Sequence, residues 1–240
     1  MNQRVGPARG TDSHQHDPVK RSPTHRLQEL LGAHFMREAG WEIPVSYGSV
    51  DEERRAIHTG LAIADITARG KIDLRGEIDP ALASLTPSHS LETGRLMSAD
   101  GAEPALILRL SHDWALTLCE AGSTESWFSS VESVSKPEVT MVTDVTSLYS
   151  GFGLLGPRRI DLLARLTGFD LSMLEPGTCA ATRVAEIAAI VLRRDTLDDA
   201  IELYVGSEFG RYAWETLLEA GRRLEARPAG WEALRAEGWW

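Results

Sequence analysis

Apolar side chains along the chain recur at spacings that predict helices and strands in alternation. From residue 27 they return every three or four positions, so a helix is expected over 27–38, with Gly40 at the place of its C-cap. Asp51 can cap a second helix over 52–59. The period then changes to two, because residues 71–75 alternate between apolar and polar positions as a half-buried strand does.

The rest of the chain continues this mixture. Two hairpins are expected, one over 105–110 and 114–119, the other over 178–183 and 186–192. Because both halves combine antiparallel strands with covering helices, the pattern predicts an α+β fold. The other expected elements are a helix over 125–134, strands over 139–145, 149–155 and 200–205, a helix that opens at Gly156-Pro157 and runs to Gly168, and a last helix through Trp214 that Gly221 ends.

The length of 240 residues allows one large core or two modest ones. Residues 1–24 are rich in Gly, Pro, Ser, His and Arg and hold almost no large apolar side chains, so they are expected to form a flexible tail. The histidines in and beside this tail lack the rigid frame that a metal site needs. We therefore predict no metal site.

Charge is distributed unevenly along the chain. Residues 1–26 carry a net charge of +3, which leaves −13 on the other residues. An acidic body repels nucleic acids and anionic membranes, so the expected partners are proteins or small molecules. No stretch approaches the roughly 20 apolar residues of a membrane span, and the two cysteines form neither a disulfide pattern nor a zinc motif. These features favour a cytoplasmic protein.

Common catalytic motifs are absent from the sequence. There is no Gly-x-Gly-x-x-Gly after a strand, no Walker loop, no Gly-x-Ser-x-Gly elbow and no His-Glu-x-x-His. Taken alone, the acidic cluster of Asp198, Asp199 and Glu202 is most simply a solvated rim at the start of a strand. Cys179 is interpreted as a small buried apolar residue rather than a nucleophile, because no histidine is near it in sequence.

Three motifs follow one another near the start of the chain: Trp-Glu-Ile-Pro-Val-Ser-Tyr-Gly at 41–48, Gly-Leu-Ala-Ile-Ala-Asp at 60–65 and Gly-Lys-Ile-Asp-Leu-Arg-Gly at 70–76. This order resembles the opening of the glycine-cleavage T-protein, an aminomethyltransferase that binds tetrahydrofolate. The resemblance is dense over 27–76 and thinner beyond. Over 144–221 the chain is most similar to the γ subunit of heterotetrameric sarcosine oxidase, a shortened relative.

The resemblance implies a fold of two α+β domains and a C-terminal barrel around a central folate. This chain ends at Trp240, about where the barrel would begin. We therefore expect two ferredoxin-like α+β subdomains with antiparallel sheets, at 25–146 and 147–240, without the barrel.

The resemblance also implies site residues, one position at a time. Glu202 matches the carboxylate that holds the guanidine-like edge of the pterin, a role that suits an acceptor of two N–H donors. The catalytic aspartate of the family falls on Glu103 or, with the other alignment of a stretch two residues short, on Ala105. The arginine on the pterin side falls on Leu234 or on its neighbour Arg235.

Two further motifs depart from the family pattern. The Asp-Val-Ser-His-Met motif has become Asp-Ile-Thr-Ala-Arg at 65–69, which loses the methionine, and the Tyr-Thr-Gly-Glu loop has become Asp-Thr-Leu-Asp at 195–198, which loses the glycine. Of five recognisable folate contacts, only Glu202 is clearly kept. Each lost contact is expected to cost about 1–3 kcal/mol of binding free energy.

Three functions are consistent with these observations. The first is a tetrahydrofolate-binding protein linked to methylene transfer from an amine donor, with Glu202 as pterin anchor and Glu103 in place of the aspartate. The second is a non-catalytic, γ-like subunit of a multi-component sarcosine or amine oxidase or demethylase, in which the segment from Trp231 to Trp240 meets flavoprotein oxidase subunits unless its rings fold back on the core. The third is a scaffold that kept the fold alone. Whether the chain is an enzyme stays open at this point.

Overall fold

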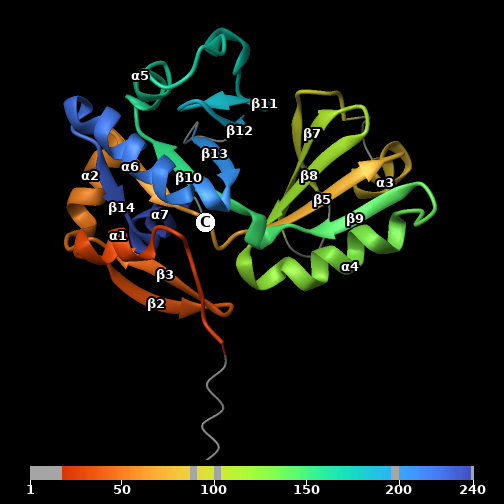
Figure 1. Ribbon diagram of the computed structural model, residues 1–240, viewed down its shortest axis with the longest axis horizontal. Helices are drawn as coiled ribbons and strands as arrows, with labels where there is room; N and C mark the ends of the chain where they lie inside the picture. Colours follow the sequence, from red (N-terminus) through yellow and green to blue (C-terminus); the bar gives the residue numbers. More distant parts are fainter. Residues whose placement is uncertain (1–17, 87–90, 100–103, 196–199, 239–240) are drawn as a thin grey trace, which may run out of the picture.

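The computed structural model describes residues 18–86, 91–99, 104–195 and 200–238, which form three open sheets arranged in two lobes (Figure 1). One lobe holds a five-stranded sheet with helices α3 (Asp79–Leu85) and α4 (Thr124–Val134), and the other holds a six-stranded sheet, a small three-stranded sheet and the remaining helices. The described residues contain no closed barrel. The predicted α+β fold class is confirmed.

The six-stranded sheet is the centre of the larger lobe. Neighbouring strands are antiparallel, apart from β14, which runs parallel to β4. One face packs on α5 (Arg159–Leu163) and α6 (Gly210–Gly221) around buried Phe152 and Trp214. In sheet order the strands are β11 (Thr178–Val184), β12 (Ile187–Arg193), β13 (Ile201–Gly206), β10 (Tyr149–Leu155), β4 (Ala62–Asp65) and β14 (Arg227–Ala229).

The smaller lobe is a fully antiparallel five-stranded sheet covered on one face by two helices. Both predicted hairpins are confirmed, here as β7–β8 and in the larger lobe as β11–β12. In sheet order the strands are β6 (Leu96–Ala99), β7 (Ala105–Ser111), β8 (Trp114–Cys119), β5 (Gly70–Gly76) and β9 (Thr140–Asp144), and the helices are α3 (Asp79–Leu85) and α4 (Thr124–Val134).

The three-stranded sheet corrects the first predicted helix. Helix α1 (His25–Leu30) ends early, and β2 (His34–Glu38) then pairs with β3 (Trp41–Ser46), which also pairs with β1 (Lys20–Arg21). Ala39 and Gly40 both have positive φ, 47° and 78°. Two such residues make a tight hairpin turn of the I′ type, so Gly40 turns a hairpin and does not cap a helix.

Two other helix predictions also need correction. Helix α2 (Val50–Thr59) starts one residue before Asp51, because the Ser49 hydroxyl accepts the backbone N–H of Glu52 and so caps the helix. Helix α5 has only five residues and does not reach Gly168. Strands β3, β4, β6 and β14 and helices α3 and α7 (Trp231–Ala236) had no counterpart in the prediction. Short 3-10 turns cover Ala121–Ser123, Thr146–Leu148, Leu171–Met173, Ser207–Phe209 and Arg222–Leu224.

The chain passes between the lobes through two short connections. Residues 66–69 lead from β4 into β5, and residues 145–148 lead from β9 into β10. The predicted subdomain 25–146 is therefore divided between the lobes, because its first forty residues pack with the second half of the chain. The predicted boundary at residue 146 assumed that each subdomain is continuous in sequence, whereas the larger lobe is built from both ends of the chain.

The last seven residues of the predicted tail belong to the folded body. Ser22 and Thr24 are buried, and both hydroxyls donate to one carboxylate oxygen of Asp65, as does the side-chain amide of Gln28 at 2.6 Å. Residues 1–17 lie outside the described residues.

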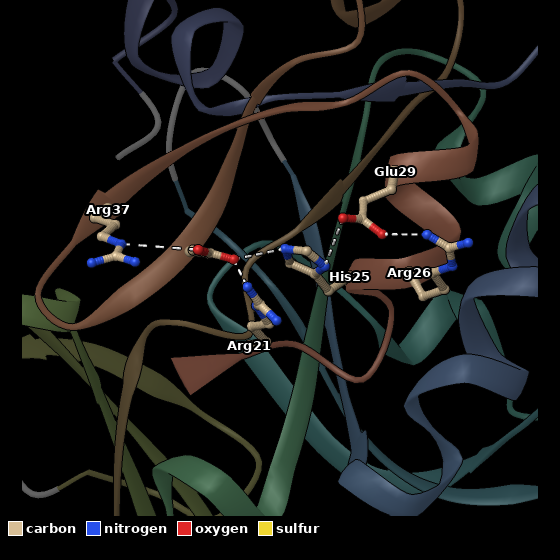
Figure 2. A network of polar contacts seen from close by, with 6 residues as sticks. Arg21, His25, Arg26, Glu29 and Arg37 are labelled. Atoms are coloured by element: carbon tan, nitrogen blue, oxygen red, sulfur yellow. Dashed lines mark hydrogen bonds and ion pairs between the residues drawn. The ribbon is translucent and has the colours of Figure 1, made fainter. Parts of the chain in front are cut away.

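A network of charged side chains also holds the same N-terminal segment against the small sheet (Figure 2). Arg21 and His25 both approach the carboxylate of Glu42 on β3, at 2.7 and 2.9 Å. The ring of His25 also stacks on Phe35 of β2, with centroids 4.2 Å apart. These contacts fasten β1 and α1 to the small sheet.

Substitution of Asp65 by asparagine tests this anchoring. Because the amide lacks the charge that three donors share, we expect the free energy of unfolding to fall by about 2 kcal/mol. Amide hydrogen exchange over residues 20–31 should quicken more than exchange in α4. Asp51→Asn, at an exposed position of α2, is the matched control and should leave both quantities unchanged. Equal protection in the two variants would contradict the anchoring role.

Candidate functional site

A cavity of about 420 Å³ lies between the two lobes. Strands β6, β7 and β8 supply an apolar wall that includes Met97, Leu106 and Leu118, and the opposite side includes Arg69 and Arg194. The volume falls in the range of roughly 300–1,000 Å³ that is typical of small-molecule sites. An apolar wall facing charged groups suits a flat ligand with a polar edge.

Glu202 lies directly behind the charged side of the cavity. Along β13, Ile201 and Leu203 face the core under α6, so the alternation of a strand turns Glu202 and Tyr204 toward the other lobe. The side chain of Glu202 is fully buried. Its partners Arg69 and Arg194 line the cavity, whereas Glu202 itself does not.

Both oxygens of the Glu202 carboxylate accept hydrogen bonds. Arg69 Nη1 and Arg194 Nε donate to Oε1, each at 2.7 Å, and the Tyr204 hydroxyl donates to Oε2 at 2.5 Å. The arginine side chains are themselves only 11% and 16% exposed. The site is thus a buried charge cluster with two cations and one anion.

This cluster keeps Glu202 ionised. Burial by itself raises the pKa of Glu202, but the charges of Arg69 and Arg194 outweigh burial and bring the pKa down to about 2. The pKa of Tyr204 is raised well above its usual value, first by burial and then by the neighbouring Glu202 charge. At neutral pH, Glu202 therefore acts only as a hydrogen-bond acceptor.

The other predicted site residues have different positions. Glu103 lies outside the described residues, but the next two residues, Pro104 and Ala105, line the cavity. Arg235 is exposed on α7, with its guanidinium 4.8 Å above the ring of Trp231, and it is not part of the cavity wall. Its neighbour Leu234 is buried in the core.

Of the acidic cluster named in the sequence, only Glu202 belongs to the described residues. Glu202 is no solvated rim residue, while Asp198 and Asp199 lie outside the described residues. Asp195, at the start of the same loop, lines the cavity.

Lys71 is a buried residue beside the cluster that sequence reasoning missed. Its ammonium donates to the carbonyls of Thr67 and Arg69, both at 2.8 Å, and of Thr146 at 3.3 Å. Since the first two carbonyls belong to one connection between the lobes and the third to the other, Lys71 ties the two connections together. Burial lowers the pKa of Lys71 to about 7.

Neither cysteine is placed for catalysis. Cys179 is buried, its thiol donates to the carbonyl of Arg95 at 3.3 Å, and burial raises its pKa to about 12. Burial likewise raises the pKa of Cys119 to about 11. The interpretation of Cys179 as a buried apolar residue is confirmed, because a thiol with such a pKa holds almost no thiolate at neutral pH.

The tryptophan-rich end folds back where it is described. Trp231 is partly buried and packs against the cluster of Trp41 and Ile43, while residues 239–240 lie outside the described residues. Among the described residues, no group of three or more His, Cys, Asp or Glu side chains is arranged to hold a metal ion. No helix in that part of the chain has the length and apolar character that crossing a bilayer requires.

Comparison with known proteins gives a consistent result. The family model described as GCVT N-terminal domain matches residues 24–239. An aminomethyltransferase of Geobacillus kaustophilus is 30% identical over 224 residues, which cover 88% of this chain and 61% of that protein. One of Symbiobacterium thermophilum is 31% identical over 231 residues, covering 89% and 62%. The chain thus spans about three fifths of the length of these relatives.

Two solved structures share the fold. Glycine cleavage system aminomethyltransferase T from Bartonella henselae superposes with a TM-score of 0.78 at 20% identity, over 90% of this chain and 60% of that one. A chain of heterotetrameric sarcosine oxidase from Corynebacterium sp. U-96 superposes with a TM-score of 0.63 at 18% identity, over 87% of this chain and 97% of that one. At these identities the likeness shows the fold.

Proposed function

The chain belongs to the GCVT N-terminal domain family, and from this premise we propose that it binds a tetrahydrofolate-type cofactor between its lobes and serves one-carbon transfer from an amine donor. The observation that carries the proposal is the ionised, buried carboxylate of Glu202 directly behind the wall of the interlobe cavity. The curated relatives named as aminomethyltransferases support the same class of chemistry.

The donors and acceptors around the cavity fit part of such a cofactor. A carboxylate that only accepts suits the planar edge of a pterin, which presents two N–H donors, at about 1.5–3 kcal/mol for each charged hydrogen bond. The apolar wall of β6, β7 and β8 suits the flat ring. This fit requires that Arg69 move, because Arg69 already donates to the Glu202 carboxylate from the side of the cavity.

Two further residues complete the proposal. When bound, a tetrahydrofolate supplies the amine that accepts the one-carbon unit. Glu103, next in sequence to Pro104 of the cavity wall, is proposed to orient and polarise that amine. Arg235 is proposed as an outer contact, since its backbone carbonyl accepts the N–H of Gly238 at 3.0 Å and Gly238 lines the cavity.

Titration of the purified chain with tetrahydrofolate under reducing, anaerobic conditions tests this function. We expect saturable binding to one site at sub-millimolar ligand by calorimetry, and Glu202→Gln should weaken it at least about tenfold, because a neutral amide replaces the charged acceptor. Glu132→Gln, at an exposed position of α4 outside the cavity wall, is the matched control and should bind as the wild type does. The proposal fails if the wild type shows no saturable binding, or if Glu202→Gln binds equally well.

A second function has its own supporting observation. The likeness to the sarcosine oxidase chain extends over 97% of that chain, which supports a role as a non-catalytic, γ-like subunit of a multi-component sarcosine or amine oxidase. Met141 and Leu148, which are 63% and 60% exposed, offer apolar surface to a partner. Affinity purification from the native source tests this role, since a γ-like subunit should bring flavin-containing subunits in fixed stoichiometry. A monodisperse monomer without flavin would exclude it.

A further inference from the structure

We propose that Arg69 is an internal competitor for Glu202, so that the ligand of the interlobe cavity binds only after the Arg69 side chain has moved aside. This inference rests on the proposed function and names the residue that sets the affinity of the site. Arg69 would thereby determine which ligands are accepted, since only a group that replaces a guanidinium on the carboxylate can displace it.

The first argument is chemical similarity. A guanidinium is planar and offers N–H donors in a fixed fork that matches a carboxylate. A 2-amino-pyrimidinone edge, such as a pterin carries, offers the same planar pair of N–H donors. Arg69 Nη1 lies 2.7 Å from Glu202 Oε1. Arg69 therefore supplies from within the chain one of the two contacts that such a ligand would make.

The second argument is direction of approach. Arg69 lines the cavity, whereas Glu202 is fully buried and is reached from the cavity only past its arginine partners. A ligand in the cavity and the Arg69 side chain thus approach the carboxylate from the same side. They compete for one position.

The third argument is that the side chain of Arg69 can leave without disturbing its backbone. The Arg69 carbonyl accepts from the Lys71 ammonium, and the Arg69 N–H donates to the carbonyl of Ile66 at 3.1 Å, so the connection between the lobes is held independently of the guanidinium. After Arg69 has left, Arg194 and Tyr204 still donate to Glu202. The vacated carboxylate retains one cationic and one neutral hydrogen-bond donor.

The experiment compares tetrahydrofolate binding by the wild type and by Arg69→Ala under identical conditions. The variant should bind about ten- to a hundredfold more tightly, because the ligand no longer displaces a charge-assisted hydrogen bond. Arg158→Ala removes an exposed guanidinium near α5, across the six-stranded sheet from the cavity, and should bind as the wild type does. Equal affinity of wild type and Arg69→Ala would overturn the inference and leave the proposed function standing.

A second readout works without folate. Methylguanidinium and 2-amino-pyrimidin-4-one, at low millimolar concentration, should raise the Tm of Arg69→Ala in a saturable way, leave the wild type unchanged, and have no effect on Arg69→Ala/Glu202→Gln. If neither protein binds tetrahydrofolate but these compounds raise the Tm of Arg69→Ala, the competitor role stands and the proposed cofactor is wrong. If the compounds also leave the Tm of Arg69→Ala unchanged, the inference is overturned. Should Arg69→Ala not fold, Arg69→Lys, which keeps the charge but lacks the planar fork, should still bind folate more tightly than the wild type.

Discussion

Replacement of Glu202 by leucine is expected to lower the free energy of unfolding by about 3–5 kcal/mol. The substitution removes the anion that two almost fully buried guanidinium groups share, and it leaves the Tyr204 hydroxyl without its acceptor. Urea denaturation followed by tryptophan fluorescence measures the change. Glu120→Leu, at an exposed position of the same cavity, is the control and should change stability by no more than about 0.5 kcal/mol. A loss below about 1 kcal/mol for Glu202→Leu would contradict the pairing.

The Glu202→Leu substitution should also change how the free energy of unfolding depends on pH in acid. The pKa of Glu202 is about 2 in the folded chain and near 4.5 without the fold, so the unfolded chain binds more protons between these values. The stability that Glu202 contributes is therefore complete above about pH 4.5 and is lost as the pH falls through 4.5 toward 2. Over that interval the wild type should lose stability more steeply than Glu202→Leu. Parallel profiles would show that Glu202 titrates normally.

Local pattern predicted the elements that show an apolar run or stripe bounded by a clear turn. Each strand of the β7–β8 hairpin is an apolar run beside the polar turn Ser111-His112-Asp113, and α6 carries its apolar residues on one stripe. Strand β4 was missed because it has only four residues, a run too short for the hydrophobic pattern to distinguish a strand. Residues 27–38 were misread because their apolar spacing fits a helix, while the turn at Ala39 and Gly40 that ends β2 lacks the usual Asn-Gly or Asp-Gly signal.

In the candidate site, the sequence indicated one residue but not the residues that contact it. Glu202 was identified from the resemblance alone, but its partners were not, because Arg69 is 133 residues away in sequence and meets it only in the folded chain. Arg194 is eight residues away, and its approach depends on the register of β12 with β13. One signal was present in the sequence: a buried carboxylate needs a cation, and residue 69 carried an arginine where the family pattern has a methionine.

Replacement of Lys71 by methionine is expected to cost about 3 kcal/mol of stability. Methionine fits the volume of the lysine stem but leaves the carbonyls of Thr67, Arg69 and Thr146 without the donor they share, at about 1 kcal/mol or more for each. Amide exchange in the connections 66–69 and 145–148 should rise more than exchange in α6. Lys136→Met, on the exposed surface beyond α4, is the matched control and should change neither quantity.

The pH dependence separates the charge of Lys71 from its packing. Burial lowers its pKa to about 7 from the usual value of 10.5, so between these values the unfolded chain binds more protons than the folded one. Stability of the wild type should consequently rise with pH across this window, by at most about 1.4 kcal/mol per pH unit from this group. The neutral amine still donates two N–H groups, so the link between the connections persists while the cost of burying a charge disappears. Lys71→Met lacks this group, and the difference in stability between the two proteins should therefore widen from pH 7 to pH 10. A difference that stays constant over this range would mean that Lys71 does not titrate there.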